Sequence, residues 1–168
     1  MKSEQLTVSS ESPQDYAVVF WTDIATIGLR FDGSRLIKID YLKKTPVKAA
    51  SNKQAQAVKN KIEKYLKPGS KTKNINADIK LNVTPFQEKV LNQLLQIPYG
   101  ETRSYGEIAK ILKTSPRAVG NACRHNPLPI IIPCHRVVAA NGIGGYSGET
   151  AGSMLDIKRR LLQLEGVI

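Results

Sequence analysis

The sequence predicts a mixed α/β protein in which a strand-rich first half is followed by a helical second half. Two observations carry this prediction. Three runs of β-forming residues lie within residues 16–41, and the chain beyond residue 84 shows one helix-start signal after another. A chain of 168 residues can form one domain or two small ones. We therefore expect an N-terminal α/β domain, residues 1–83, and a helical domain, residues 84–168.

The strands are expected at residues 16–21, 24–31 and 35–41, which are rich in Val, Ile, Phe and Tyr. Asp32-Gly33-Ser34 separates the last two runs and is typical of a hairpin turn, which makes those strands antiparallel. Residues 1–14 are polar, and we expect them to form a flexible tail.

Residues 51–66 are predicted to form a helix that ends at Lys67-Pro68-Gly69. Apolar residues recur there at helical spacing, and lysines occupy the other face. The polar segment 67–83 follows as a linker that can hold a short strand. The residues expected in the core on this helix are Ala55, Val58, Ile62, Tyr65 and Leu66.

Four helices are predicted in the second half, the first three from their start signals and the last from its apolar residues. The segments 84–87 (TPFQ) and 104–107 (SYGE) both fit the capping box, Ser115-Pro116 starts a third helix, and a fourth runs over residues 152–164. The second helix ends near Leu112 and the third near His125. The expected buried residues are Phe86, Val90, Leu91, Leu94 and Leu95 on the first helix, Ile108 and Ile111 on the second, and Met154, Leu155, Ile157, Leu161 and Leu162 on the last.

The second and third of these helices have the spacing of a helix-turn-helix. The second helix of such a motif lies against DNA. Here it reads PRAVGNACRHN and presents Arg117 near its start and Arg124 two turns later. Small residues such as Ala118 lie between them and permit close approach to a backbone. An ordinary amphipathic helix with solvated arginines explains the pattern equally well.

The charge favours a polyanionic partner. The chain holds 25 basic and 14 acidic residues, a net charge of +11, although solubility or an anionic membrane would also account for this excess. Residues 1–84 hold 13 Lys and 2 Arg, whereas residues 85–168 hold 4 Lys and 6 Arg. Because the planar guanidinium suits phosphate and base contacts, the better nucleic-acid signal lies in the second half.

The composition also excludes several classes of protein. No apolar run approaches the roughly 20 residues that span a bilayer, and the first residues lack the apolar segment of a secretory signal. Two cysteines and two histidines cannot build a disulfide framework or a CxxC…CxxC zinc site. We expect a cytoplasmic protein, or a nuclear one in a eukaryote.

Residues 126–138, NPLPIIIPCHRVV, place Cys134 and His135 after three prolines. The prolines exclude a helix and predict a rigid, extended apolar segment. The neighbouring imidazole and arginine favour the nucleophilic thiolate. Adjacent residues of an extended segment point to opposite sides, so contact between the two side chains needs a bend or a bridging water. On this evidence Cys134 is as well explained as a small buried residue.

Residues 141–148 are rich in Gly and Asn around Tyr146-Ser147. This composition predicts a mobile loop that can close over a ligand. The loop lacks the glycine patterns of phosphate-binding loops, which argues against a kinase or a dinucleotide-binding protein.

The segment RAVGNACRHNPLPIIIPCHRVVAANGIGGYSG resembles the active-site signature of the O6-alkylguanine-DNA alkyltransferases, the methylated-DNA–protein-cysteine methyltransferases. The PCHRV core, the upstream Asn-Pro and the downstream Tyr-Ser-Gly carry the resemblance. It covers residues 84–166 closely and the first half only in layout. It implies an RNase H-like N-terminal domain and a winged helix-turn-helix-like catalytic domain.

The resemblance implies a role for single residues at the thiol. Cys134 would be the alkyl acceptor, His135 would take its proton through a water, and Glu165 would orient His135. Asn126 would brace the segment that carries Cys134.

The resemblance also implies contacts with DNA and with the target base. Tyr105 would press on the phosphate 3′ of the target and assist proton transfer to guanine. Arg117 would replace the extruded base in the stack, with Ala118 and Arg124 also at the DNA. The residues expected around the flipped base are Pro129, Val137, Tyr146, Ser147 and Lys158.

The implied function is direct repair of double-stranded DNA. A monomer would flip O6-alkylguanine, and also O4-alkylthymine, and transfer the alkyl group irreversibly to itself, once per molecule and without a cofactor or a membrane. Residues 1–84 contain no Cys and no His, so the zinc site of some relatives is not expected. Cys123 is interpreted as a core or groove-lining residue, with a second reactive thiol as the alternative.

Two rival functions use parts of the same pattern. A helix-turn-helix DNA-binding protein without alkyl transfer would use the basic helix but not the PCHR motif. A Cys–His–Glu hydrolase would use the thiol, would turn over, and would not need the helix pair.

Overall fold

The computed structural model describes residues 13–148 and 152–168. Its contacts divide the chain into two compact units, one up to Asn82 and one from Val83. The tail expected at residues 1–14 lies outside the described residues except for its last two, which belong to a short 3-10 turn, η1 (Pro13–Asp15). No described helix combines the length and the apolarity needed to cross a membrane.

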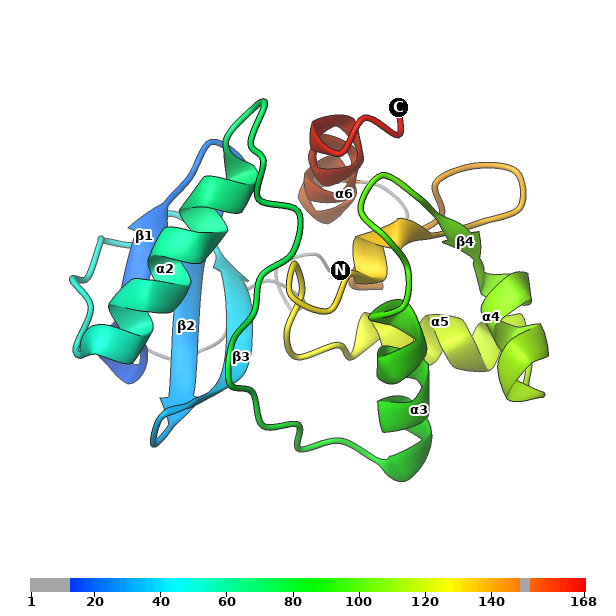
Figure 1. Cartoon of the computed structure of the whole chain (residues 1–168), viewed down its shortest axis with the longest axis horizontal. Coiled ribbons are helices and arrows are strands. Elements are labelled where there is room, and N and C mark those ends of the chain that lie inside the picture. The colour runs from blue at the N-terminus through cyan, green and yellow to red at the C-terminus, as the bar shows by residue number, and fades with distance from the viewer. Residues whose placement is uncertain (1–12, 149–151) are drawn as a thin grey trace. The chain divides into compact units, whose positions relative to one another are not determined.

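The first unit is an antiparallel sheet with a helix packed on it. Its strands β1 (Val18–Trp21), β2 (Thr26–Asp32) and β3 (Arg35–Leu42) lie in chain order. Alternate residues of a strand share a face of the sheet, so two rows of residues paired across the strands lie on the same face. Figure 1 shows α2 (Lys53–Leu66) across the sheet. The two rows are Val18–Leu29–Ile39 and Phe20–Ile27–Tyr41, and all six side chains are buried.

The side chains that α2 buries explain why it forms where the spacing predicts. Ala55, Val58, Ile62 and Tyr65 are buried, whereas Leu66, also expected in the core, is only half-buried in the last turn. Asn52 caps the first turn by accepting a hydrogen bond from the backbone N–H of Ala55 at 2.9 Å. The linker that follows forms one β-bridge, between Ile79 and Leu36.

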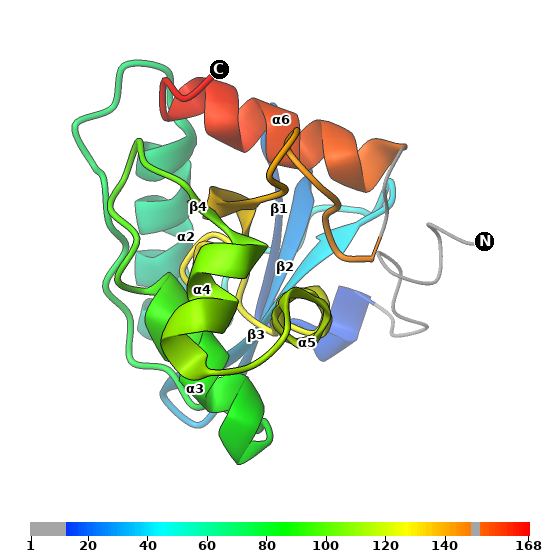
Figure 2. The ribbon, with the colours of Figure 1, turned by 90° about the vertical axis from the view of Figure 1, so that its right-hand side faces the viewer.

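In the second unit, residues 83–148 and 152–168 form four α-helices: α3 (Pro85–Leu94), α4 (Tyr105–Leu112), α5 (Pro116–Arg124) and α6 (Ser153–Leu164). Figure 2 views α5 nearly along its axis, with α3 and α4 beside it. Two short strands, β4 (Arg103–Ser104) and β5 (Val137–Val138), pair in parallel. The expected α/β class with its three-stranded antiparallel sheet is confirmed. The β4–β5 pair was not predicted, because two residues carry no periodicity.

The start signals of α3 and α4 differ in completeness. At α4 the capping box is complete: Glu107 N–H donates to Ser104 Oγ at 3.0 Å, and Ser104 N–H donates to the Glu107 carboxylate at 2.6 Å. At α3, Thr84 accepts from the backbone of Gln87 at 3.1 Å. The Gln87 side chain does not complete the box, because it donates to the carbonyl of His125 at 2.9 Å.

Three residues expected in the core are exposed instead: Phe86 at 40%, Leu95 at 44% and Ile111 at 59%. Phe86 lies in the first turn of α3 and Leu95 is its C-cap, whereas the buried residues Val90, Leu91 and Leu94 lie between them. On α4 the buried pair is Ile108 and Ala109. Ile111 lies about 200° around the helix from Ala109, so it falls outside that face.

The prediction of an extended segment before Cys134 is wrong, because the backbone there turns repeatedly. Ile132 N–H donates to the carbonyl of Leu128, and Cys134 N–H donates to that of Ile132, both at 2.8 Å. Residues Cys134–Arg136 then form the 3-10 turn η2. Prolines exclude a helix, but their fixed φ suits turns as well as extended chain. The bend that the Cys134–His135 pair requires is therefore part of the backbone.

We predict that Ser104→Ala destabilises the second unit by ~1 kcal/mol, because the N-terminal amides of α4 lose their cap. Urea unfolding followed by circular dichroism measures the loss. Ser153→Ala, at an exposed position in the first turn of α6, is the matched control and should stay within about 0.5 kcal/mol of the wild type. Equal effects of the two substitutions would contradict the role of the capping box.

Candidate active site

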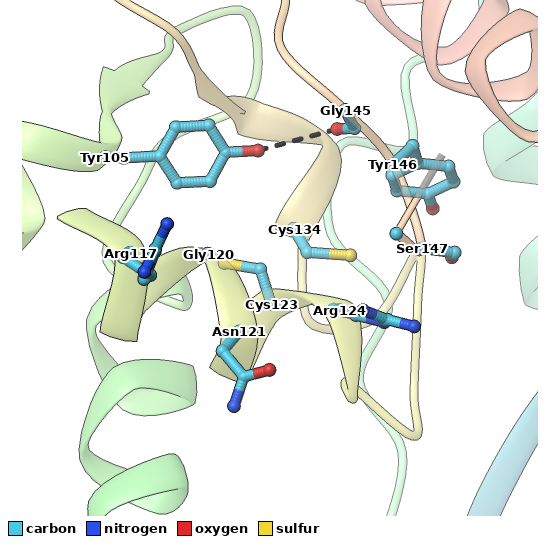
Figure 3. Close-up of a pocket in the computed structure, with 11 residues that line it drawn as sticks. Tyr105, Arg117, Gly120, Asn121, Cys123, Arg124, Cys134, Gly145, Tyr146 and Ser147 are labelled. Carbon is cyan, nitrogen blue, oxygen red and sulfur yellow. Dashed lines mark hydrogen bonds between the residues drawn. The ribbon is translucent and has the colours of Figure 1, made fainter. Parts of the chain in front are cut away.

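A pocket of about 280 Å³ opens in the second unit. This volume lies just below the roughly 300–1,000 Å³ common for ligand sites. Figure 3 shows that it lies between α5, the start of α4, the turn η2 and the glycine-rich loop. Its lining residues are Tyr105, Arg117, Gly120, Asn121, Cys123, Arg124, Cys134, Gly145, Tyr146, Ser147 and Gly148. The pocket thus joins the helix-turn-helix pair to the PCHR motif.

Cys134 lines this pocket and is only 6% exposed. Burial raises the pKa of the thiol, while the Asn126 side chain, the Lys158 ammonium and the Tyr146 side chain oppose that shift. The net direction is upward, so the resting thiol is protonated at neutral pH. A nucleophilic reaction at Cys134 therefore needs a group that takes its proton.

His135 is the neighbouring residue and is completely buried. Its Nε2 lies 2.7 Å from Glu165 Oε2. Burial lowers the pKa of the imidazole, and the Glu165 carboxylate opposes this. A neutral ring that donates from Nε2 to the carboxylate has its lone pair on Nδ1. In this tautomer His135 can accept a proton at Nδ1.

Arg136 belongs to the same cluster and was missed by sequence reasoning, which treated it only as a charge near the thiol. It is 4% exposed. Its Nε and Nη2 donate to the two oxygens of Glu165, both at 2.9 Å, and its Nη1 donates to the carbonyl of Ile97 at 2.7 Å. Its place directly after Cys134-His135 was the signal that could have identified it.

Lys158 connects the acceptor segment to the glycine-rich loop. The side chain is fully buried, and its ammonium donates to the carbonyls of Val137 at 2.7 Å and Gly145 at 2.9 Å. Burial lowers the pKa of Lys158 to about 8, with Cys134 and Cys123 opposing the shift. The ammonium therefore holds the two segments together and also favours a thiolate at Cys134.

Asn126 ties together both ends of the turn that precedes Cys134. Its Nδ2 donates to the carbonyl of Ile132 at 2.8 Å, and its Oδ1 accepts from Leu128 N–H at 3.0 Å. Ile130 lies between them with a φ of 75°, which a β-branched residue rarely adopts. Such strain persists only where surrounding contacts enforce it, and Asn126 supplies part of that restraint.

Tyr105 covers one side of the pocket. Its hydroxyl donates to the carbonyl of Gly145 at 3.5 Å, and Figure 3 shows the ring directed toward the loop. Burial raises the pKa of the phenol, as do Cys123 and Cys134. Gly144 packs against this ring with a φ of 75°, where a Cβ would lie 3.0 Å from the ring and 3.2 Å from the amide of Ala139.

Besides Tyr105 on α4, the candidate DNA-binding residues lie on α5. Arg117 and Arg124 are exposed at the pocket, while Ala118 is half-buried beside the N-cap. The Arg124 side chain packs against the backbone of Gly148, where a Cβ would lie 2.8 Å from Nε. Ser147, the preceding residue, has a φ of 49°. The loop and α5 therefore form the rim of the pocket together.

Not every candidate substrate-binding residue lines the pocket. Pro129 and Val137 are buried and are not among the lining residues, although the carbonyl of Val137 is fixed by Lys158. Cys123, in contrast, lines the pocket. Burial raises the pKa of its thiol, and Cys134 adds to that shift, which makes Cys123 a weak nucleophile.

Comparison with known proteins decides the family. A family model described as 6-O-methylguanine DNA methyltransferase, DNA binding domain, matches residues 85–167. Over 147 residues the chain is 34% identical to the methylated-DNA–protein-cysteine methyltransferase of Metallosphaera sedula, covering 88% of this chain and 90% of that relative. The chain belongs to the methylated-DNA–protein-cysteine methyltransferase family. The resemblance inferred from the PCHRV segment is confirmed.

Other members of the methyltransferase family match parts of the chain more closely. The relative from Methanocaldococcus vulcanius is 64% identical over 70 residues, which are 42% of this chain and 44% of that protein. The relative from Archaeoglobus fulgidus is 53% identical over 91 residues, which are 52% of this chain and 60% of that protein. The chain thus spans about half the length of these two relatives.

A solved structure of the family resembles most of the chain. The crystal structure of Mycobacterium tuberculosis OGT in complex with DNA has a TM-score of 0.72 at 35% identity, over 88% of this chain and 90% of that one. The fold described above is therefore that of the methyltransferase family in both units.

We predict that Lys158→Met destabilises the protein by about 2–3 kcal/mol, because two buried carbonyls lose their donor. The loss should grow between about pH 8 and 10. In the folded state the pKa of Lys158 is lowered, so between these pH values the unfolded chain binds more protons than the folded protein. The wild type therefore gains stability from this group as the pH rises, whereas Lys158→Met does not.

Urea unfolding near pH 7.5 and pH 10 measures this dependence. Lys110→Met, at an exposed position on α4, is the matched control and should change stability little at either pH. A loss for Lys158→Met that is the same at both pH values would contradict the buried ammonium.

Proposed function

We propose that the protein repairs DNA directly by transferring the alkyl group of O6-alkylguanine to Cys134, once per molecule. One observation carries the proposal: a buried cysteine lies in a pocket beside a helix-turn-helix, with a hydrogen-bonded His135–Glu165 pair behind it. The family membership supports the same activity. By the same displacement Cys134 would also accept the alkyl group of O4-alkylthymine, because in both lesions the alkyl carbon is bonded to an exocyclic oxygen of the base.

The transfer is a displacement at the alkyl carbon. The Cys134 proton passes through a bridging water to His135 Nδ1, and the Sγ–C bond forms as the C–O6 bond breaks. The electron pair of the broken bond stays on guanine, which must be protonated to leave as a neutral base. The Tyr105 hydroxyl lies in the pocket, and its raised pKa keeps it protonated and able to donate. The product is a thioether, which water does not hydrolyse, so no second turnover follows and no cofactor is needed.

The DNA contacts follow from where the reacting atom lies. An O6-alkyl carbon is inside the duplex, so the base must be flipped into the pocket. Arg117 is exposed at the start of α5 and can fill the space that the base leaves. Arg124 can reach a phosphate, and the small side chain of Ala118 lets α5 lie close to the DNA groove. Such contacts recognise the shape of the groove and the phosphates and do not depend on the base sequence.

Inside the pocket, Tyr146 and Ser147 contact the flipped base, and Pro129 and Val137 support the pocket wall.

The two rival functions leave parts of the site unused. A DNA-binding protein without alkyl transfer has no use for a buried thiol that directly precedes a histidine hydrogen-bonded to a glutamate. A hydrolase would turn over, whereas a methylated cysteine is a dead end. We propose a monomer that acts where DNA is, in the cytoplasm or, in a eukaryote, the nucleus.

We predict that incubation with a double-stranded oligonucleotide carrying O6-methylguanine adds one methyl group to Cys134. Intact-mass spectrometry with peptide mapping detects the product. Cys134→Ser should show no mass increase, whereas Cys123→Ser should still be methylated. An unmodified wild-type Cys134 after prolonged incubation would favour the DNA-binding protein without chemistry.

We predict that Arg117→Ala slows repair of the duplex roughly tenfold or more but hardly changes the reaction with free O6-benzylguanine, because only the duplex requires base extrusion. Rates of Cys134 alkylation by the two substrates measure the difference. Arg159→Ala, at an exposed arginine of α6, is the matched control and should leave both rates unchanged. Equal losses with both substrates in Arg117→Ala would rule out the insertion role.

A further inference from the structure

Two adjacent residues of the PCHR motif bind the same carboxylate. His135 meets one oxygen of Glu165, and the guanidinium of Arg136 spans both oxygens. We propose that Arg136 is a positioning residue for the alkyl transfer: its guanidinium keeps Glu165 ionised and oriented, so that His135 is held with Nδ1 as the base for Cys134. This inference rests on the proposed function of Cys134 as the alkyl acceptor.

The geometry around Arg136 is that of a rigid clamp. A guanidinium that donates two parallel hydrogen bonds to a carboxylate fixes both the position and the plane of that carboxylate. The third donor is anchored on the carbonyl of Ile97, and the guanidinium lies 5.7 Å from the centre of the Tyr99 ring. Gly100 N–H adds a hydrogen bond to Glu165 Oε1 at 3.1 Å. The clamp thus ties η2 and the end of α6 to residues 97–100.

The buried negative charge of the His135–Glu165 pair also requires a positively charged partner. Glu165 and His135 are buried, and a neutral imidazole with an ionised carboxylate carries one negative charge. Such a buried charge is costly without a partner, and the pair would neutralise itself by binding a proton. A protonated His135–Glu165 pair could not accept the proton of Cys134. The Arg136 guanidinium supplies the compensating charge and leaves the pair able to act as a base.

The other charged and titratable groups at the cluster do not replace Arg136. Lys158, from α6, also disfavours a protonated His135, but its ammonium is directed to the carbonyls of Val137 and Gly145. Tyr99 faces Glu165 and Arg136 with a phenol whose pKa is raised by burial, so it stays neutral. Cys134, from η2, is the proton donor.

The test is the pH dependence of methyl transfer in Arg136→Gln. Without the guanidinium the Glu165–His135 pair binds a proton more tightly, so the acid limb of the rate profile should move up by about one pH unit or more, a roughly tenfold loss on that limb. Arg136→Lys keeps the positive charge but cannot bind both oxygens of Glu165. The pH at which its rate falls on the acid side should therefore stay near that of the wild type, while its maximal rate at higher pH should be lower. Arg159→Gln on α6 is the matched control and should keep the wild-type profile.

A second reaction separates this inference from the proposed function. Iodoacetamide alkylates thiolates by displacing iodide and needs no DNA, and peptide mapping distinguishes Cys134 from Cys123. The same upward shift for Cys134 in Arg136→Gln supports the clamp even if the wild type takes no methyl group from the oligonucleotide, an outcome that would overturn only the proposed function.

Thermal unfolding of each variant shows whether it is folded. If Arg136→Gln does not fold, Arg136→Lys decides, and a wild-type plateau in that variant would overturn the clamp. A folded Arg136→Gln with the wild-type acid limb in both reactions would also overturn it and leave Arg136 a purely structural residue.

Discussion

The buried carboxylate of Glu165 is the constraint on which the candidate site depends. A charge in the protein interior is tolerated only where it is paired and its oxygens accept hydrogen bonds. Here His135, Arg136 and the amide of Gly100 provide four such bonds. They join the end of α6, the turn η2 and the chain before β4, so the position of the thiol next to His135 follows from the same contacts.

The burial and the charges around Cys134 favour a thiol that stays protonated until a base accepts its proton. Burial raises the pKa of the thiol, while Lys158 and Asn126 reduce the cost of forming the thiolate when a base accepts the proton. The same Lys158 holds the loop that carries Tyr146 and Ser147. Activation of the thiol and placement of the pocket wall are thus coupled through one ammonium group.

The backbone supports this arrangement at its strained points. Ile130 and Ser147 both have a positive φ, one in the turn before Cys134 and one in the loop that closes the pocket. Asn126 restrains the first of these segments through two hydrogen bonds, and Arg124 packs against the second beside Gly148. A pocket built from restrained turns and two helices is preorganised, so little ordering remains to be done when a base enters.

Much of the fold could be predicted from the sequence, because the signals involved act over a few residues. Asp32-Gly33-Ser34 marks the hairpin, and Ser104 with Glu107 marks the start of α4, whatever the rest of the chain does. The PCHRV segment likewise identified the family and the candidate nucleophile. These features depend on neighbours in the chain, which the sequence states directly.

The tertiary structure decided what depends on distant partners. Arg136 lies 29 residues from Glu165, and Lys158 lies 21 residues from Val137, so neither pairing leaves a local pattern. The turns before Cys134 were also beyond prediction, since proline excludes a helix without choosing between turn and extended chain. Which side of a helix is buried, as with the exposed Ile111, depends on what packs against it. Local propensity therefore determined the elements, and long-range burial of charge determined the site.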